Sequence, residues 1–286
     1  MSSTTSLAIA ALPERDVPWR SRPGNEAPHV PYLTIGESRI YFEQHGAGPS
    51  LVLLHGVGGN HASWFAQIAG LSHRWRLTTL DLRGFGNSAD VEQSGRESFA
   101  DDLVTIWHEL RLEGSVLIGQ SMGGGAAMAF AAEHAARLRA LVVADSLVGL
   151  ELPPVARERM AVAEAATADL PQVERVLGSR VRTAMPERVA LYQQLASFNS
   201  VNLRTLKGAP RRVTLESLER SGLPILFIAG QEDVLFPPQA VRAVHERLAN
   251  SSYAEIEGAG HSAHFEDPDA FNLVLSDWLE RLACPR

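Results

Sequence analysis

The segment Val116-Leu117-Ile118-Gly119-Gln120-Ser121-Met122-Gly123-Gly124-Gly125 places three apolar residues directly before a Gly-x-Ser-x-Gly motif. A run of mostly small residues with helical propensity, 126–132, follows it. This pattern predicts a strand, a sharp turn and a helix, with the Ser121 hydroxyl exposed above the sheet. Because unpaired backbone N–H groups at a helix N-terminus favour negative charge, Ser121 is a candidate nucleophile.

The composition is that of an ordinary globular protein, with 286 residues of which 45% are hydrophobic. A formal net charge of -7 argues against a nucleic-acid-binding protein. The single cysteine, Cys284, rules out a disulfide within the chain and favours a reducing cytoplasm. The apolar stretch 7–12 follows no Lys or Arg, so we expect no signal peptide, and no stretch has the roughly 18 apolar residues of a membrane span.

Predicted strands and helices alternate along most of the chain. Residues 1–31 contain five prolines and are expected to form an extended arm. Strands at 32–35 and 40–44 form a hairpin by their turn residues. Six further strands are predicted at 51–54, 77–80, 116–118, 141–144, 225–229 and 253–256. The alternation predicts an α/β fold with a mainly parallel eight-stranded sheet flanked by helices.

One long segment interrupts this alternation. Residues 147–222 show no clear buried strand, only helical patterns separated by prolines. We interpret this segment as an inserted helical cap, and residues 32–146 and 223–286 as the core that carries the sheet. No low-complexity segment or internal repeat is apparent.

Three reactive residues each follow a predicted strand. They are Ser121, Asp233 and His261. Because ligands bind at the carboxyl ends of the strands in open α/β sheets, we expect the three loops to converge on one site. Asp145 also follows a strand and competes for the acid role, but we favour Asp233.

The sequence resembles the α/β-hydrolase superfamily over residues 32–283. The matching segments are Leu51 to Gly56, Asp81 to Ser88, Gly119 to Gly123, Gly230 to Asp233, and Gly260-His261. The chain order Ser, Asp, His is that of the family. The resemblance implies that Ser121 is the nucleophile, His261 the base and Asp233 the acid. It also implies an oxyanion hole formed by the backbone N–H groups of Met122 and Val57.

Other polar residues near the motifs are assigned structural roles. Asp81 and Arg83 are expected to hold a turn, and His55, His61 and His264 to pack around the site. The histidines lack zinc-type spacing such as His-Glu-x-x-His, so no metal is predicted. Residues 56–59 lack the Gly-Lys-Ser/Thr ending of a phosphate loop, so no nucleotide or other cofactor is expected.

The resemblance implies a serine hydrolase that cleaves a carboxylic ester or lactone through an acyl-enzyme. The small-molecule substrate is expected in a largely apolar pocket under the cap. Candidate lining residues are Trp64, Met160, Tyr192, Phe198, Leu235 and Phe236. Cleavage of a carbon–carbon bond in a diketone or vinylogous acid is an alternative, although His55 to Asn60 lacks the Gly-Pro-Gly often seen in such enzymes. Perhydrolases, triad-using synthases and ligand receptors on this fold also stay open, and the oligomeric state is not predicted.

Overall fold

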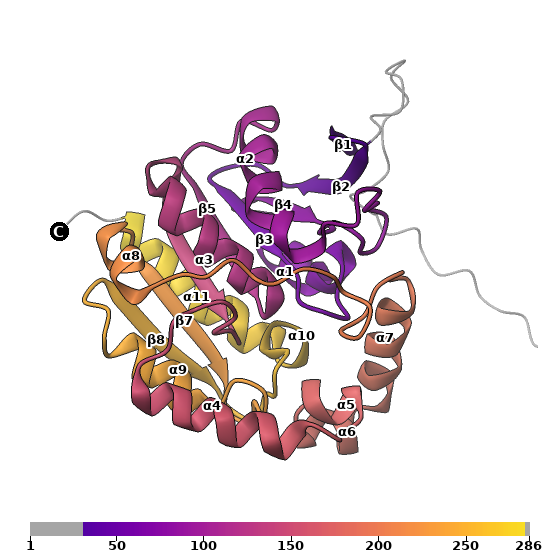
Figure 1. Cartoon of the computed structure of the whole chain (residues 1–286), viewed down its shortest axis with the longest axis vertical. Helices are drawn as coiled ribbons and strands as arrows, with labels where there is room; N and C mark the ends of the chain where they lie inside the picture. The colour runs from indigo at the N-terminus through magenta and orange to yellow at the C-terminus, as the bar shows by residue number, and fades with distance from the viewer. Residues whose placement is uncertain (1–30, 284–286) are drawn as a thin grey trace, which may run out of the picture. The chain divides into compact units, whose positions relative to one another are not determined.

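The structure is a computed structural model that describes residues 31–283, and the predicted N-terminal arm lies outside these residues except for Pro31. An eight-stranded sheet has the order β1-β2-β4-β3-β5-β6-β7-β8 (Figure 1). Its strands are β1 (Tyr32–Ile35), β2 (Ser38–His45), β3 (Ser50–Leu54), β4 (Arg76–Leu80), β5 (Ser115–Gln120), β6 (Leu138–Ala144), β7 (Ile225–Gly230) and β8 (Ser251–Ile256). The β1–β2 and β2–β4 pairs are antiparallel and the other pairs are parallel. This confirms the predicted fold class and the position of each predicted strand.

The central strands are apolar on both faces because the sheet lies between two helical layers. On β3, Val52 and Leu54 belong to one hydrophobic cluster, while Leu51 and Leu53 belong to another. Successive side chains of a strand point to opposite faces, so the unbroken apolar run supplies both cores.

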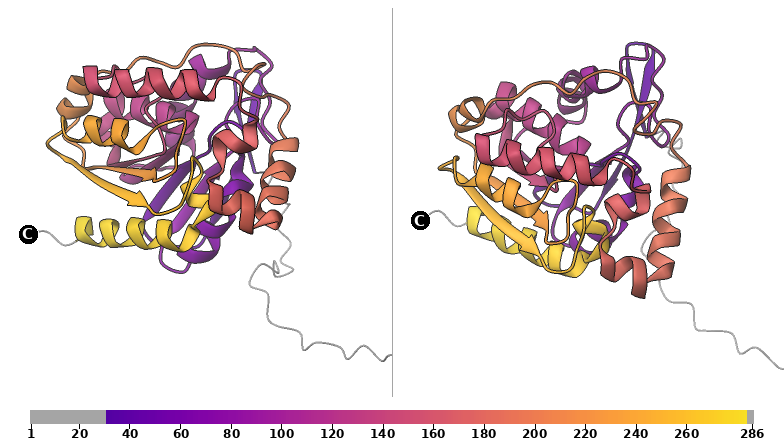
Figure 2. Two further views of the ribbon diagram at one scale, coloured as in Figure 1. Left: turned by 90° about the horizontal axis from the view of Figure 1, so that it is seen from below. Right: turned by 60° about the horizontal axis from the view of Figure 1, so that its bottom comes forward.

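Each face of the sheet has its own helices (Figures 1 and 2). Side chains from α1 (Phe65–Leu71) and α11 (Pro268–Ala283) build one cluster. Side chains from α2 (Phe99–Glu109), α3 (Met122–His134) and α9 (Pro238–His245) build the other. Shorter helices are η1 (His61–Trp64), η2 (Gly95–Ser98), η3 (Ala135–Arg137) and α10 (Ala263–Glu266). Within residues 31–283, none of the helices is long and apolar enough to span a membrane.

The segment between β6 and β7 is mainly helical. Its helices are α4 (Pro154–Thr167), α5 (Gln172–Val176), α6 (Ser179–Ala184), α7 (Pro186–Ser197) and α8 (Leu215–Arg220). Residues of α5, α6 and α7 form a small apolar cluster with Phe265, which follows the last strand. The final helix, α8, instead packs against α3. A single bridge pairs Leu150 with Val213, so the two ends of the insertion meet.

Candidate active site

Ser121 forms the turn between β5 and α3. Its φ of 51° and ψ of -117° are rarely adopted by a residue with a side chain, at a cost of about 1–3 kcal/mol. The backbone is held on both sides, since its N–H donates to Ala144 O (3.0 Å) and its carbonyl oxygen accepts from Ser146 Oγ (2.6 Å). A Cβ at Gly119 would overlap the carbonyl oxygen of Gly123, so the tight turn requires glycine there. The strand, turn and helix lie where the motif predicts them.

Three side chains form a hydrogen-bonded chain at the carboxyl edge of the sheet. His261 Nε2 lies 2.8 Å from Ser121 Oγ, and His261 Nδ1 lies 2.9 Å from Asp233 Oδ2. The second carboxylate oxygen, Asp233 Oδ1, accepts from the N–H groups of Leu235 (2.8 Å) and Phe236 (2.9 Å). The side chains of Ser121, Asp233 and His261 are all buried. This arrangement can pass a proton from the hydroxyl to an imidazole that a carboxylate orients and stabilises.

Asp145, the competing acid, lies deeper and binds other groups. Its Oδ1 accepts from the N–H of Gly230 (2.7 Å) and its Oδ2 from the N–H of Ala263 (3.2 Å). Burial raises the pKa of Asp145 well above its usual value, and the charge of Asp233 raises it further. Asp145 thus ties together the loops that carry the acid and the histidine, whereas Asp233 is the carboxylate bonded to His261.

Two backbone N–H groups are available beside Ser121. Met122 is the first residue of α3, whose opening N–H groups have no partner within the helix. Val57 lies in the loop after β3. Within the described part of the chain, neither N–H donates a hydrogen bond. An oxyanion hole formed by these two groups would require N–H donors that are not used within the protein, and it stays a prediction.

A buried carboxylate, Glu266, supports the histidine loop. Its Oε1 accepts from the N–H groups of Gly260 (3.0 Å) and Ser262 (3.1 Å), the two neighbours of His261. Its Oε2 accepts from the N–H of Gly178 (2.7 Å), in the insertion. Burial raises the pKa of Glu266, and the three N–H groups oppose that shift. The sequence reasoning missed this residue, whose only signal was a carboxylate five positions after the histidine.

A second carboxylate fixes the insertion near the acid. Glu232, directly before Asp233, accepts from the N–H (2.6 Å) and the hydroxyl (3.0 Å) of Ser179. The ion pair Arg180–Asp267 adds a contact of 2.9 Å. The start of α6 is therefore bonded to both of the loops that carry Asp233 and His261.

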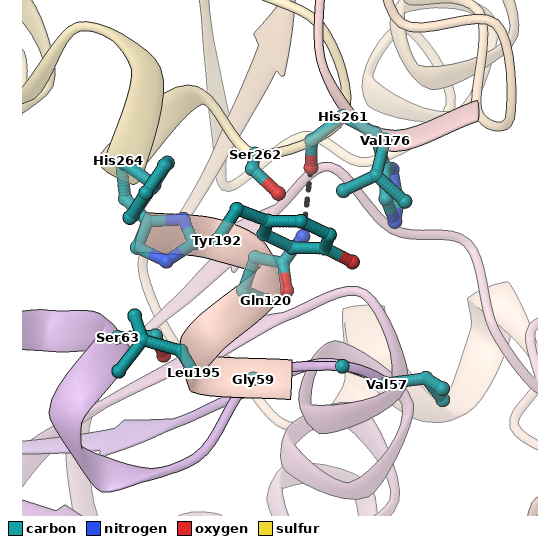
Figure 3. A pocket seen from close by; sticks show the side chains of 12 residues that line it. Val57, Gly59, Ser63, Gln120, Val176, Tyr192, Leu195, His261, Ser262 and His264 are labelled. Carbon is teal, nitrogen blue, oxygen red and sulfur yellow. Dashed lines mark hydrogen bonds between the residues drawn. The ribbon is translucent and has the colours of Figure 1, made fainter. Parts of the chain in front are cut away.

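A cavity opens beside His261, beneath the insertion (Figure 3). It is lined by Val57, Gly58, Gly59, Ser63, Gln120, Val176, Tyr192, Leu195, His261, Ser262, His264 and Phe265. The Gln120 amide donates to the carbonyl oxygen of His261 (2.7 Å) and so connects the serine turn to the histidine loop. The Tyr192 hydroxyl accepts from Gln172 Nε2 (2.9 Å), which fixes the ring over the cavity.

Of the six residues predicted to line the pocket, Tyr192 lines this cavity. Trp64 is fully buried in the core between the sheet and α11. Phe198 lies beyond the end of α7 and is 69% exposed, so it contacts water instead. Met160 and Leu235 are partly buried against apolar clusters, and Phe236 stacks on the imidazole of His261 at 5.5 Å. These five side chains are not part of the wall of this cavity, because residue type alone does not reveal which way a side chain points.

The remaining polar residues near the motifs make structural contacts. The two ring nitrogens of His55 each bond a backbone group, at 2.8 and 3.0 Å. His61 Nδ1 lies 2.8 Å from the buried carboxylate of Asp81. Arg83 binds both carboxylate oxygens of Asp102, at 2.6 and 2.9 Å. These contacts agree with the structural roles expected for the four residues named from the sequence.

His264 differs from these histidines because its ring has no polar partner. The side chain is 3% exposed and packs against Trp64 at 4.3 Å between ring centres. Both of its ring nitrogens lack a hydrogen bond within residues 31–283. Burial lowers the pKa of His264 to about 3, with smaller contributions from His261 and His55. The imidazole is therefore neutral at physiological pH.

The low pKa of His264 predicts acid sensitivity of the fold. An unfolded histidine takes up a proton below about pH 6.5, while the folded protein does not until about pH 3, so stability falls as the pH drops below 6.5. The His264→Gln variant is expected to lose less unfolding free energy than the wild type between pH 7 and pH 5, measured by urea denaturation. His108→Gln, which removes an exposed histidine, should keep the wild-type pH dependence. Parallel curves for wild type and His264→Gln would contradict the prediction.

Comparison with known proteins agrees with this fold. The family model described as alpha/beta hydrolase fold matches residues 49–268. A thermophilic esterase from Thermogutta terrifontis is 27% identical with a TM-score of 0.73, over 88% of this chain and 97% of its own. The enol-lactonase from Burkholderia xenovorans is 23% identical with a TM-score of 0.70, over 87% and 100%. A bromoperoxidase from Bacillus anthracis is 24% identical with a TM-score of 0.69, over 85% and 96%. The chain therefore belongs to the alpha/beta hydrolase fold family.

Proposed function

We propose that the protein is a serine hydrolase that cleaves a carboxylic ester or lactone of a small, largely apolar substrate. The observation that carries this proposal is the hydrogen-bonded chain from Ser121 through His261 to Asp233. These three side chains lie at the carboxyl edge of the sheet, where ligands bind in this type of fold. The similarity to the Thermogutta terrifontis esterase supports the same reaction class.

The first half of the reaction forms an acyl-enzyme. Ser121 Oγ attacks the carbonyl carbon while His261 Nε2 takes the hydroxyl proton, and Asp233 stabilises the imidazolium that results. The carbonyl oxygen becomes negative and accepts hydrogen bonds from the N–H groups of Met122 and Val57. The bond to the leaving oxygen then breaks, and His261 gives its proton to that oxygen.

The second half releases the acid. A water molecule attacks the acyl carbon, and His261 takes one of its protons. The ester bond to Ser121 breaks as the proton returns to Oγ, which restores the free enzyme. In this scheme residues 147–222 act as the cap that encloses the acyl and leaving groups. We also propose a cytoplasmic location, because a chain with a single cysteine forms no disulfide within itself.

A substrate panel tests the reaction class. Esters, lactones and diketones of matched size are offered to the wild type and to Ser121→Ala, and multiple turnovers are counted. The proposal expects turnover of esters or lactones that depends on Ser121. Turnover of diketones alone would assign carbon–carbon cleavage, and a single slow turnover on every compound would assign a ligand receptor.

Loss of the Glu266 carboxylate is expected to impair both stability and rate. In the wild type, three N–H groups donate to the two carboxylate oxygens of Glu266. Glu266→Gln leaves only one side-chain oxygen, so at least one N–H loses its acceptor. We expect the free energy of unfolding to fall by about 1–3 kcal/mol. We expect kcat for an ester to fall about 10- to 100-fold, because small displacements of His261 are costly.

The control for this prediction is Asp269→Asn. It removes an exposed carboxylate three residues further along the chain and should change both quantities little. Urea denaturation and steady-state kinetics measure the two effects. Equal behaviour of Glu266→Gln and Asp269→Asn would show that the three hydrogen bonds of Glu266 do not position the histidine.

A further inference from the structure

A buried hydrogen-bonding group without a partner belongs to the wall of the cavity beside His261. His264 lines the cavity, yet neither of its ring nitrogens has a protein partner within residues 31–283. A buried polar group without a partner destabilises the folded protein, so such groups call for an explanation. A neutral imidazole presents one N–H donor and one nitrogen acceptor.

The ring of His264 is held in place by its neighbours. Trp64 packs against the ring in a tilted arrangement at 4.3 Å, and Phe271 packs edge-on at 6.0 Å between ring centres. The backbone is fixed as well, because Gln67 Nε2 donates to the carbonyl oxygen of His264 (2.9 Å). A ring fixed by packing loses little further freedom when a ligand binds it, which favours recognition of a specific group.

The chemistry of the cavity wall points to an uncharged polar ligand. Ser63 and Ser262 add hydroxyl groups to the wall, and the Ser262 hydroxyl has no hydrogen-bond partner in the described part of the chain. No Asp, Glu, Lys or Arg lines the cavity. A charged substituent would therefore lose its hydration without an opposite charge to replace it. A hydroxyl can donate to one polar group of the wall and accept from another.

The position of His261 in the cavity wall suggests which part of a substrate the cavity would take. His261 borders it, and in the proposed reaction His261 delivers a proton to the leaving oxygen. Figure 3 shows His264 on one side of the cavity and Val57 on the other. Substituents on the alcohol part of an ester would thus extend from His261 into the cavity.

We propose that this cavity is a subsite for an uncharged hydroxyl group on the alcohol part of the substrate, and that His264 is its specificity-determining residue. The inference rests on the proposed ester hydrolysis and narrows the substrate to esters of diols and similar hydroxylated alcohols. A subsite built to bond a hydroxyl rejects an analogue that lacks it, because its buried polar groups then stay unpaired.

A pair of isosteric esters tests the proposal. 2-Hydroxyethyl acetate and propyl acetate differ only by a terminal hydroxyl in place of a methyl group. The wild type should have a higher kcat/KM for the hydroxylated ester, and His264→Phe should lower the ratio of the two kcat/KM values about tenfold. His264→Gln, which keeps a donor and an acceptor, should retain part of the ratio. Equal losses on both esters in His264→Phe would show a packing role only and overturn the proposal.

A second measurement needs no change at His264 and no turnover. In Ser121→Ala protein with nitrogen-15-labelled histidine, the ring signals of His264 are followed by NMR as each ester is added. The proposal expects these signals to move with 2-hydroxyethyl acetate and to stay in place with propyl acetate. Equal responses to both esters would overturn it. Absence of Ser121-dependent turnover in the wild type, with the selective response retained, would instead refute only the proposed reaction.

Discussion

Replacement of Ser121 by alanine is expected to lower kcat/KM for a simple activated ester such as 4-nitrophenyl acetate by about 10⁴-fold or more. The variant keeps the N–H groups of Met122 and Val57, but it has no oxygen to form the acyl-enzyme. The strained turn should persist, because Ala144 and Ser146 bond the backbone of residue 121 and not its side chain. Thermal unfolding should therefore change little while the rate falls.

Ser115→Ala is the matched control for this prediction. Ser115 is a buried serine at the start of β5, and its hydroxyl has no hydrogen-bond partner in the described residues. Its loss should leave kcat/KM within a factor of about two, as for changes remote from the reacting groups. If Ser121→Ala kept activity within tenfold of the wild type, the serine mechanism would be rejected. An acyl-enzyme trapped by rapid quench and located on Ser121 by mass spectrometry would support it directly.

The fold was predictable because its strands carry strong local signals. A run such as Leu51 to Leu54 is apolar at every position. Such a run indicates a strand whose two faces are both covered by other elements. The turn at Ser121 was also predictable, because it requires glycine at positions 119 and 123 to avoid steric overlap. The positions of Asp233 and His261 followed from the strands that precede them.

The lining of the cavity was not predictable, because it depends on long-range packing. Whether Trp64 faces a substrate or the core is set by α11, some 200 positions later in the chain. Phe198 is aromatic but emerges into water where α7 ends. Glu266 acquires its role only when Gly178, from the insertion, is brought against it. Periodicity reports which face of an element is apolar, and it does not report which distant element meets that face.

The choice between the two carboxylates rests on what each one binds. Asp233 contacts the imidazole, whereas Asp145 accepts from the backbone N–H groups of Gly230 and Ala263. We expect Asp233→Asn to lower kcat about 10³- to 10⁴-fold, because the amide cannot stabilise the imidazolium and favours the wrong tautomer. Its fold should persist, since an asparagine oxygen can still accept from Leu235 and Phe236.

Asp145→Asn should show the opposite effects: a loss of stability with little change in kcat. One of its two acceptor oxygens becomes an NH₂ group, so the N–H of either Gly230 or Ala263 loses its partner, at a cost of about 1–3 kcal/mol in unfolding free energy. The imidazole keeps its carboxylate, so kcat should stay within about tenfold of the wild type. Steady-state kinetics and urea denaturation on both variants separate the effects. If Asp145→Asn lost the activity and Asp233→Asn kept it, the acid role would pass to Asp145, because only a carboxylate that stabilises the cationic histidine has an effect of that size on the rate.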